Sequence, residues 1–483
     1  MSVFSEKLQS FVTNANIKIA VLSKLSGVDR SFIQKMLSGE RIPSDPAVLE
    51  SLSSALMLTP AERRILKESY SVSKMGEAIY YRRVMVKRLI EDVESHFAQL
   101  PYTRNPAPTA ASFPDVLPLQ GKTAVIDALQ LFLQNESSLP SPSLFAVIQP
   151  DCEAARVFGS NCRMMSSLRV EHIVCFDNEL QYQKENKYNL QCMKSLLPFL
   201  FSPCQYSGWF YYDSISSHAT HTSVMPWFIL GQRGVMALSQ DGEKAMLYHT
   251  PESVALYQRI FDEIREESLP LFEVQEENSA QFWNSNQWLS LQDSMSYMLD
   301  YEPCWGFFFT MDMVEKQLNR DIPNREQVLS FFSSRQQQIS LLDKKERKNT
   351  SFFTLEGLDY FLATGRITEL PEEMYTPLPK AFRAELLRRM LICAQRGNYF
   401  PFLLRSKKFR ISRRISLMIS DDQRLSCSCI HPVRGPMLVI LREKSIVYSI
   451  CDFMEYLQQT GLIYSREESL ELLKKRLEEF CSA

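Results

Sequence analysis

Apolar residues in the first 70 positions recur with the three- and four-residue spacing that places side chains on one helix face. Small turns separate these stretches. Thr59, Pro60 and Glu62 add an N-cap, a proline at the first helical position and a capping box. The pattern predicts five helices: Phe4–Thr13, Lys18–Ser26, Asp29–Ser38, Pro46–Met57 and Thr59–Tyr70.

A connecting segment is predicted over residues 71–118. Helical spacing continues through residues 73–100, with an apolar stripe, a basic centre and an acidic end. The stripe contains Tyr81, Val84, Met85 and Leu89. A proline-rich stretch follows over residues 101–118, and this composition predicts a linker. Its prolines are Pro101, Pro106, Pro108, Pro114 and Pro118.

Residues 119–270 alternate between helix and strand patterns, which predicts an α/β regulatory domain. Helices are expected at Thr123–Gln134, at Tyr188–Leu197, where Pro198 should stop the helix, and at Ser253–Glu266. Strands are expected at Leu144–Ile148, Val170–Phe176, Trp209–Tyr212, Trp227–Leu230, Val235–Leu238 and Ala245–Tyr248.

Residues 271–483 predict a mixed helical and α+β C-terminal region. Residues 271–400 are expected to be mostly helical, and residues 401–483 return to strands before two final helices. This end repeats the order of residues 224–266, strand, turn and helix with an aromatic stripe, as an internal duplication would produce. The expected helices are Gln287–Leu299, Arg325–Leu341, Lys380–Cys393, Ile446–Gln459 and Arg466–Phe480; the strands are Ile415–Ile419 and Met437–Leu441. The predicted fold class is therefore multidomain, an all-α head followed by these two regions.

Composition restricts the class of protein. The chain has 483 residues, 45% hydrophobic and 23% charged, as in soluble globular domains. No uncharged apolar stretch approaches the length of a membrane span, and the first residues are not those of a signal peptide. We therefore expect a cytoplasmic protein with no membrane partner. Because the net charge is only −2, nucleic-acid binding would need a local basic surface.

No metal, cofactor or catalytic centre is predicted. The eleven cysteines show no C-x-x-C pair, which favours buried thiols. His218 and His221 have H-x-x-H spacing, with Cys204 and His249 not far along the chain, but a polar loop explains this Ser/Thr-rich segment better. Phosphate-binding, dinucleotide, hydrolase and kinase motifs are missing, so we expect no enzyme activity, although residues 119–483 leave that question open.

Three further clusters have alternative interpretations. The aromatic block could form core, a ligand pocket or a dimer interface, with core packing favoured. It contains Trp283, Trp288, Trp305, Phe307, Phe308 and Phe309. The run Arg405–Arg414 has six cations, which could bind a DNA backbone or an anionic ligand, or lie on a solvated strand edge. A second basic cluster is expected to be an exposed loop: Lys344, Lys345, Arg347 and Lys348.

The most informative stretch runs from Ile19 to Ser44. Gly27 stands where the chain must turn sharply, and Asp29 can cap the third helix. The inward positions of the second helix, the turn and the third helix are expected to be Leu22, Leu25, Val28, Ile33, Met36 and Leu37. The outward positions are Ser31, Lys35 and Ser38, flanked by Arg30 and Gln34. A short helix with a packed back and a polar front suits the major groove.

This stretch resembles the XRE family of helix-turn-helix domains, which includes phage Cro and repressor proteins. The resemblance covers about residues 4–70. The matching positions are Leu22, Gly27, Val28, Asp29, Ile33, Gly39, Arg41, Pro43 and Ser44. The resemblance implies that Arg30, Ser31 and Lys35 read bases, that Phe32 or Gln34 assists, and that Ser38 and Arg41 meet phosphates. Ile19 stands where the family often has a phosphate-binding Gln, so that contact is not expected.

These observations predict a sequence-specific DNA-binding transcriptional regulator. Residues 1–70 would be the DNA-binding domain, and the C-terminal domains, residues 119–270 and 271–483, would sense an effector or oligomerise. The expected partners are double-stranded DNA, a second copy of the chain, and a small-molecule or protein effector. An alternative is an antitoxin or phage-defence interaction protein whose head regulates its own gene. A third interpretation is an enzyme with a DNA-binding head.

Overall fold

A computed structural model shows the chain as two compact units. The first contains the residues up to Met85 together with Lys187, and the second contains the other described residues from Val86 onward. Helix α6 (Glu77–Phe97) crosses this boundary. The structure describes residues 2–97, 113–163, 166–178, 187–214, 224–276, 295–322, 325–342, 349–368, 370, 372–420 and 424–482.

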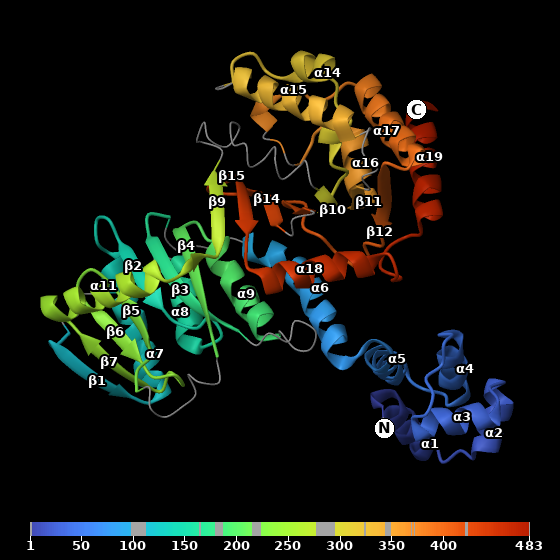
Figure 1. Cartoon of the computed structure of the whole chain (residues 1–483), viewed down its shortest axis with the longest axis horizontal. Coiled ribbons are helices and arrows are strands. Elements are labelled where there is room, and N and C mark those ends of the chain that lie inside the picture. Colours follow the sequence, from blue (N-terminus) through green and yellow to red (C-terminus); the bar gives the residue numbers. More distant parts are fainter. Residues whose placement is uncertain are drawn as a thin grey trace. The chain divides into compact units, whose positions relative to one another are not determined.

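The first unit is helical, and all five predicted helices are present (Figure 1). They are α1 (Val3–Asn14), α2 (Ile19–Ser26), α3 (Arg30–Ser38), α4 (Ala47–Ala55) and α5 (Pro60–Met75). The capping box of Thr59 and Glu62 is confirmed. The helix after it is longer than predicted and runs to Met75. Gly76, at φ +92°, separates it from α6, so the connecting helix begins at Glu77 instead of residue 73.

The second unit contains two mixed sheets flanked by helices. The first sheet has the order β1-β7-β6-β5-β2-β3-β4-β8, in which β2, β3 and β4 are parallel and the other neighbours antiparallel. Its strands are β1 (Val116–Gln120), β2 (Ser143–Val147), β3 (Arg169–Asp177), β4 (Gln205–Asp213), β5 (Trp227–Leu230), β6 (Val235–Leu238), β7 (Lys244–Tyr248) and β8 (Leu269–Pro270). We call residues 116–270 the first module.

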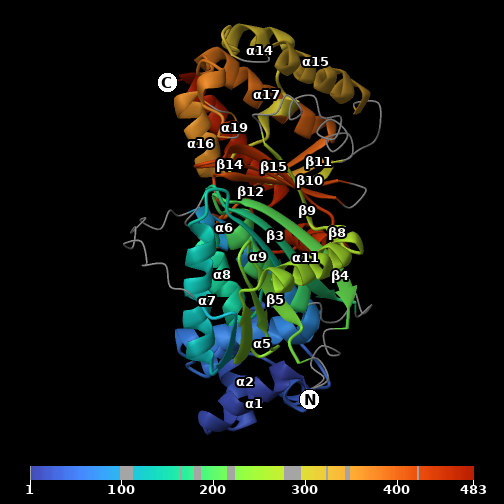
Figure 2. The same ribbon diagram turned by 90° about the vertical axis from the view of Figure 1, so that its left-hand side faces the viewer.

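Helices cover the first sheet because its central strands bury side chains on both faces. Every residue of β5 and β6 is buried, which requires a layer on each side. Helix α7 contacts β1, β2 and β7, whereas α11 contacts β2, β5 and β6; α7 and α8 lie side by side (Figure 2). The helices are α7 (Lys122–Ser137), α8 (Glu153–Cys162), α9 (Lys187–Leu200) and α11 (Pro251–Glu266).

The second sheet has the order β12-β11-β10-β13-β14-β15-β9. Its strands are β9 (Phe272–Glu276), β10 (Met295–Asp300), β11 (Asn349–Thr354), β12 (Tyr399–Leu404), β13 (Ile415–Ser420), β14 (Leu425–His431) and β15 (Gly435–Leu441). Its main helices are α14 (Met311–Gln317), α15 (Arg325–Leu342), α16 (Leu355–Thr364), α17 (Lys380–Arg396), α18 (Lys444–Leu457) and α19 (Arg466–Ser482). We call residues 272–482 the second module.

The two modules share one topology. Strands β1 to β7 correspond in order and direction to β9 to β15, with the parallel trio β2-β3-β4 matched by β10-β11-β12. Even the antiparallel β8 at the edge of β4 has a counterpart, because Ile463 bridges Leu404 of β12 in the antiparallel sense. Helices α11 and α18 follow equivalent strands. This correspondence is the arrangement expected from an internal duplication, and it extends well beyond the single repeated strand-turn-helix of the sequence.

Three predictions about elements are wrong. The helix expected at Gln287–Leu299 is strand β10 in its described part, and residues 271–400 also contain β9, β11 and the start of β12. Helix α9 does not stop at Pro198 but continues to Leu200. The predicted linker overlaps β1, an edge strand where Pro118 is tolerated because an edge leaves some N–H groups without partners.

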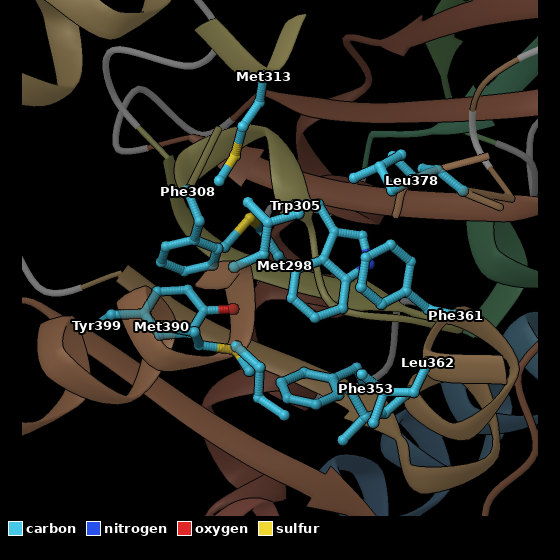
Figure 3. Close-up of a cluster of buried hydrophobic side chains, with 14 of the residues drawn as sticks. Met298, Trp305, Phe308, Met313, Phe353, Phe361, Leu362, Leu378, Met390 and Tyr399 are labelled. Atoms are coloured by element: carbon cyan, nitrogen blue, oxygen red, sulfur yellow. The ribbon is translucent and has the colours of Figure 1, made fainter. Parts of the chain in front are cut away.

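The described residues of the predicted aromatic block, Trp305, Phe307, Phe308 and Phe309, belong to the core of the second module or pack against it. Trp305, 1% exposed, stacks on Phe361 at a centroid separation of 4.1 Å (Figure 3). Phe308 meets Tyr399 edge to face at 5.2 Å. Core packing is therefore the outcome for these side chains, whereas Trp283 and Trp288 lie outside the described residues. Within the described part of the chain, none of the helices has the length and apolarity needed to cross a bilayer.

Candidate nucleic-acid interface

Helices α2 and α3 are joined by the three residues Gly27–Asp29. Gly27 ends α2 with φ +69°, a left-handed conformation that glycine adopts at low cost. Asp29 caps α3 as predicted, accepting a hydrogen bond from the Phe32 N–H at 3.0 Å. Gly39, at φ +85°, ends α3 in the same way. The turn and both helix ends are thus fixed by local sequence.

One face of α3 is fully packed. Ile33 and Met36 are both 0% exposed and lie in one apolar cluster with Leu22 of α2. Burial of each such side chain contributes about 1.5–3 kcal/mol relative to exposure, which fixes the rotation of α3. Ile19 is partly buried against the same cluster, so this position serves the core. The expectation that Leu25 faces inward is wrong, because its side chain is 59% exposed.

The opposite face of α3 is polar and exposed. Arg30, Gln34 and Lys35 are exposed, and Arg41 follows on the next loop. Within the described residues, these four side chains make no hydrogen bond or ion pair. They are therefore available to a ligand that offers base edges or phosphates.

The remaining three predicted contact residues are already engaged within the unit. Ser31 donates its hydroxyl hydrogen to Asp29 at 2.7 Å, and that bond is the largest cause of the lowered pKa of the Asp29 carboxyl. Ser38 donates to the Lys35 carbonyl oxygen at 3.1 Å. Phe32 is half-buried against the core. Direct recognition by Ser31 or Ser38 would require exchange of an existing bond, and Phe32 serves mainly as packing.

Two features of this unit were not predicted from the sequence. Val21 and Leu25, four residues apart on α2, form an exposed apolar pair, being 47% and 59% exposed. Helix α5 lines an open groove of about 580 Å³, with Arg63 and Lys67 on its wall. Both cations contact Glu50, at 4.0 and 2.5 Å, so the groove is partly neutralised. In the sequence, this groove could have been anticipated from Arg63 and Lys67, whose spacing of four residues places both cations on one side of α5.

The histidine and cysteine signals do not converge on a metal site. Among the residues that the structure describes, no group of three or more His, Cys, Asp or Glu side chains could hold a metal ion. His249 stacks on Phe113 at 4.9 Å, and its Nδ1 lies 3.1 Å from the Arg233 carbonyl oxygen. Cys204 is buried beside Ser202. His218, His221 and the basic cluster Lys344–Lys348 lie outside the described residues.

Comparison with known proteins adds no family. The sequence matches no family model and no curated protein. A phosphatidylserine synthase from Haemophilus influenzae Rd KW20 is similar over 82% of this chain and 97% of its own, at 9% identity and a TM-score of 0.25. TrmBL2, an archaeal chromatin protein with a novel mode of DNA binding, is similar over 52% of this chain and 87% of its own, at 12% identity and a TM-score of 0.19. At these TM-scores, neither likeness bears on fold or function.

Proposed function

We propose that the chain is a sequence-specific DNA-binding transcriptional regulator. In this proposal α3 enters the major groove, and the two modules form a region that senses an effector or oligomerises. The observation that carries it is the division of α3 into a buried face, Ile33 and Met36, and an exposed face with Arg30, Gln34 and Lys35. Arginine and lysine bind guanine edges, and glutamine binds adenine, in the major groove.

Helix α6 supports a regulatory role for the modules, because both of them hold its C-terminal half. From the first module, Lys194 pairs with Asp92 at 2.9 Å, and Phe201 packs on Phe97 at 4.7 Å. From the second module, Arg414 pairs with Glu94 at 3.3 Å. A change in the packing of the two modules would therefore act on the helix that leads into the DNA-binding unit.

Substitution of the exposed α3 cations tests the proposed function. We expect Arg30→Ala and Lys35→Ala each to weaken binding to the chain's own promoter by about 1–3 kcal/mol, since each removes a base contact. Fluorescence anisotropy with a labelled promoter duplex measures this effect. The matched control is Lys7→Ala, an exposed cation on α1 that should leave affinity unchanged. If neither substitution nor the pair alters promoter binding, α3 is not the reading helix.

We further propose that the regulator is a homodimer, because one reading helix recognises only a half-site and two-fold pairing spaces two of them one helical turn apart. The apolar stripe of α6 is a poor candidate interface, since its Leu89 is only 7% exposed. We therefore expect the modules to pair. Sedimentation should show a dimeric full chain, alongside a monomeric fragment that ends near Pro101. A full chain that stays monomeric at tens of micromolar, with DNA present, would contradict pairing.

A further inference from the structure

The basic run Arg405–Arg414 forms a folded loop between β12 and β13, which we call the cationic loop. It is not the strand edge that the sequence offered as one alternative. The backbone N–H groups of Lys408 and Phe409 donate to the Arg405 carbonyl oxygen at 2.7 and 3.1 Å, which closes a turn. Phe409, 0% exposed, packs edge to face on Phe453 of α18 at 5.7 Å. The loop is thus anchored by a buried aromatic side chain.

The far side of the cationic loop is fixed to α6. The Arg410 N–H donates to Glu91 at 3.2 Å, and the Ser412 hydroxyl donates to Glu94. Lys87 lies 5.6 Å from the centre of the Phe409 ring and pairs with Glu91 at 2.6 Å. The loop therefore holds one conformation before any ligand arrives, which reduces the ordering cost of binding.

In the part of the chain that the structure describes, two of the six cations form ion pairs with carboxylates of the protein. Arg405 pairs with Glu468 at 3.1 Å, and Arg414 pairs with Glu94. The others are exposed and make no ion pair within 4 Å in the described part of the chain. They are Lys407, Lys408, Arg410 and Arg413. Four exposed cations without ion pairs, within seven residues of an anchored loop, form a positive patch on a chain whose net charge is −2, although the carboxylates of Glu91 and Glu356 also contact the loop.

We propose that these four cations form a second DNA-binding surface, which contacts phosphates and reads no bases. The inference rests on the proposed function, because DNA is the polyanion that this function brings to the chain. The loop meets it with exposed cations that the protein itself leaves without ion pairs, on a backbone held by Glu91 and Glu94. Cations of this kind bind phosphates without reading sequence and release condensed counterions.

The salt dependence of DNA binding by the full chain tests this surface. Each lost phosphate contact should reduce the slope of log affinity against log salt by about 0.9, so a variant with all four cations changed to Gln should lose about 3.6. The affinity of this variant for promoter duplex and for scrambled duplex of equal length should fall by the same factor. The control removes four exposed cations elsewhere in the modules and should keep the wild-type slope: Lys244→Gln, Arg259→Gln, Lys474→Gln and Lys475→Gln.

The α3 variants separate the two proposals. Lys35→Ala should lower the preference for promoter over scrambled duplex, whereas the loop variants should leave that preference unchanged. An unchanged slope in the four-fold variant, with a Lys35→Ala effect intact, overturns the second surface alone. A wild-type chain that binds neither duplex overturns both proposals. If the four-fold variant melts at a lower temperature than the wild-type chain, the single variants Lys407→Gln and Arg413→Gln replace it in the test. Each should reduce the slope by about 0.9.

Discussion

Replacement of Trp305 by alanine is expected to destabilise the second module by about 3–5 kcal/mol. The indole is 1% exposed and fills the space between Phe361, on which it stacks, and the rest of the core in Figure 3. Alanine would lose the transfer free energy of the ring and leave a cavity that the surrounding helices and strands can only partly close. Urea unfolding of the full chain, followed by circular dichroism, measures the loss.

A Trp305→Phe variant is the control for ring burial. The indole Nε1 of Trp305 is buried and makes no hydrogen bond among the described residues. Replacement by phenylalanine therefore removes no polar contact. We therefore expect a loss less than half that of Trp305→Ala. Equal losses in the two variants would show that burial of a single aromatic ring does not support this part of the core, which would contradict the prediction.

The second large effect is expected at Glu443, between the two modules. Its side chain is 0% exposed and accepts hydrogen bonds from the Tyr212 hydroxyl of β4 at 2.6 Å and from the Ile446 N–H of α18 at 2.7 Å. Glu443→Ala removes the cap of α18 and leaves the buried N–H groups of Ser445 and Ile446 without this acceptor. These losses together should destabilise the chain by about 3 kcal/mol, again measured by urea unfolding.

A double-mutant cycle isolates the contact between modules. Tyr212→Phe removes only the hydroxyl and should cost about 1 kcal/mol. Because the two side chains share this bond, the effects of Tyr212→Phe and Glu443→Ala should fail to add, with a coupling of at least about 0.5 kcal/mol. Additive effects would mean that Glu443 acts only as the cap of α18.

The helical unit could be predicted because its signals are local. Gly27, Asp29 and the Thr59 capping box each determine a helix end through bonds within a few residues, and Ile33 and Met36 show the packed face by their spacing. The sequence could not show which of several suitable side chains completes the core, or which nearby group takes a given hydrogen bond. Leu25 has the spacing of a core residue, yet the core is completed without it. The hydroxyl of Ser31 is taken by its own cap residue.

In the second module the predicted helices α15, α17, α18 and α19 and strands β13 and β15 are present, but the sequence does not predict β10 and β11, because these strands do not alternate. In β10, Met298 and Leu299 are consecutive and both buried, and in β11 so are Phe352 and Phe353. Strands covered on both faces read as continuous apolar runs, which spacing alone cannot distinguish from buried helix. Strand β11 pairs with β10 and β12 over separations of about 50 residues, so no local turn chemistry marks these pairings.

The passage from one module to the other is a single residue long. Strand β8 ends at Pro270 and β9 begins at Phe272, so only Leu271 separates strands of two different sheets. Leu271 is 0% exposed, and its N–H donates to the Gly208 carbonyl oxygen at 2.9 Å. A hinge needs residues that are free to change φ and ψ, and Leu271 is held by burial and by this hydrogen bond. Relative motion of the two modules would therefore occur by shear, as small sliding of packed surfaces past one another.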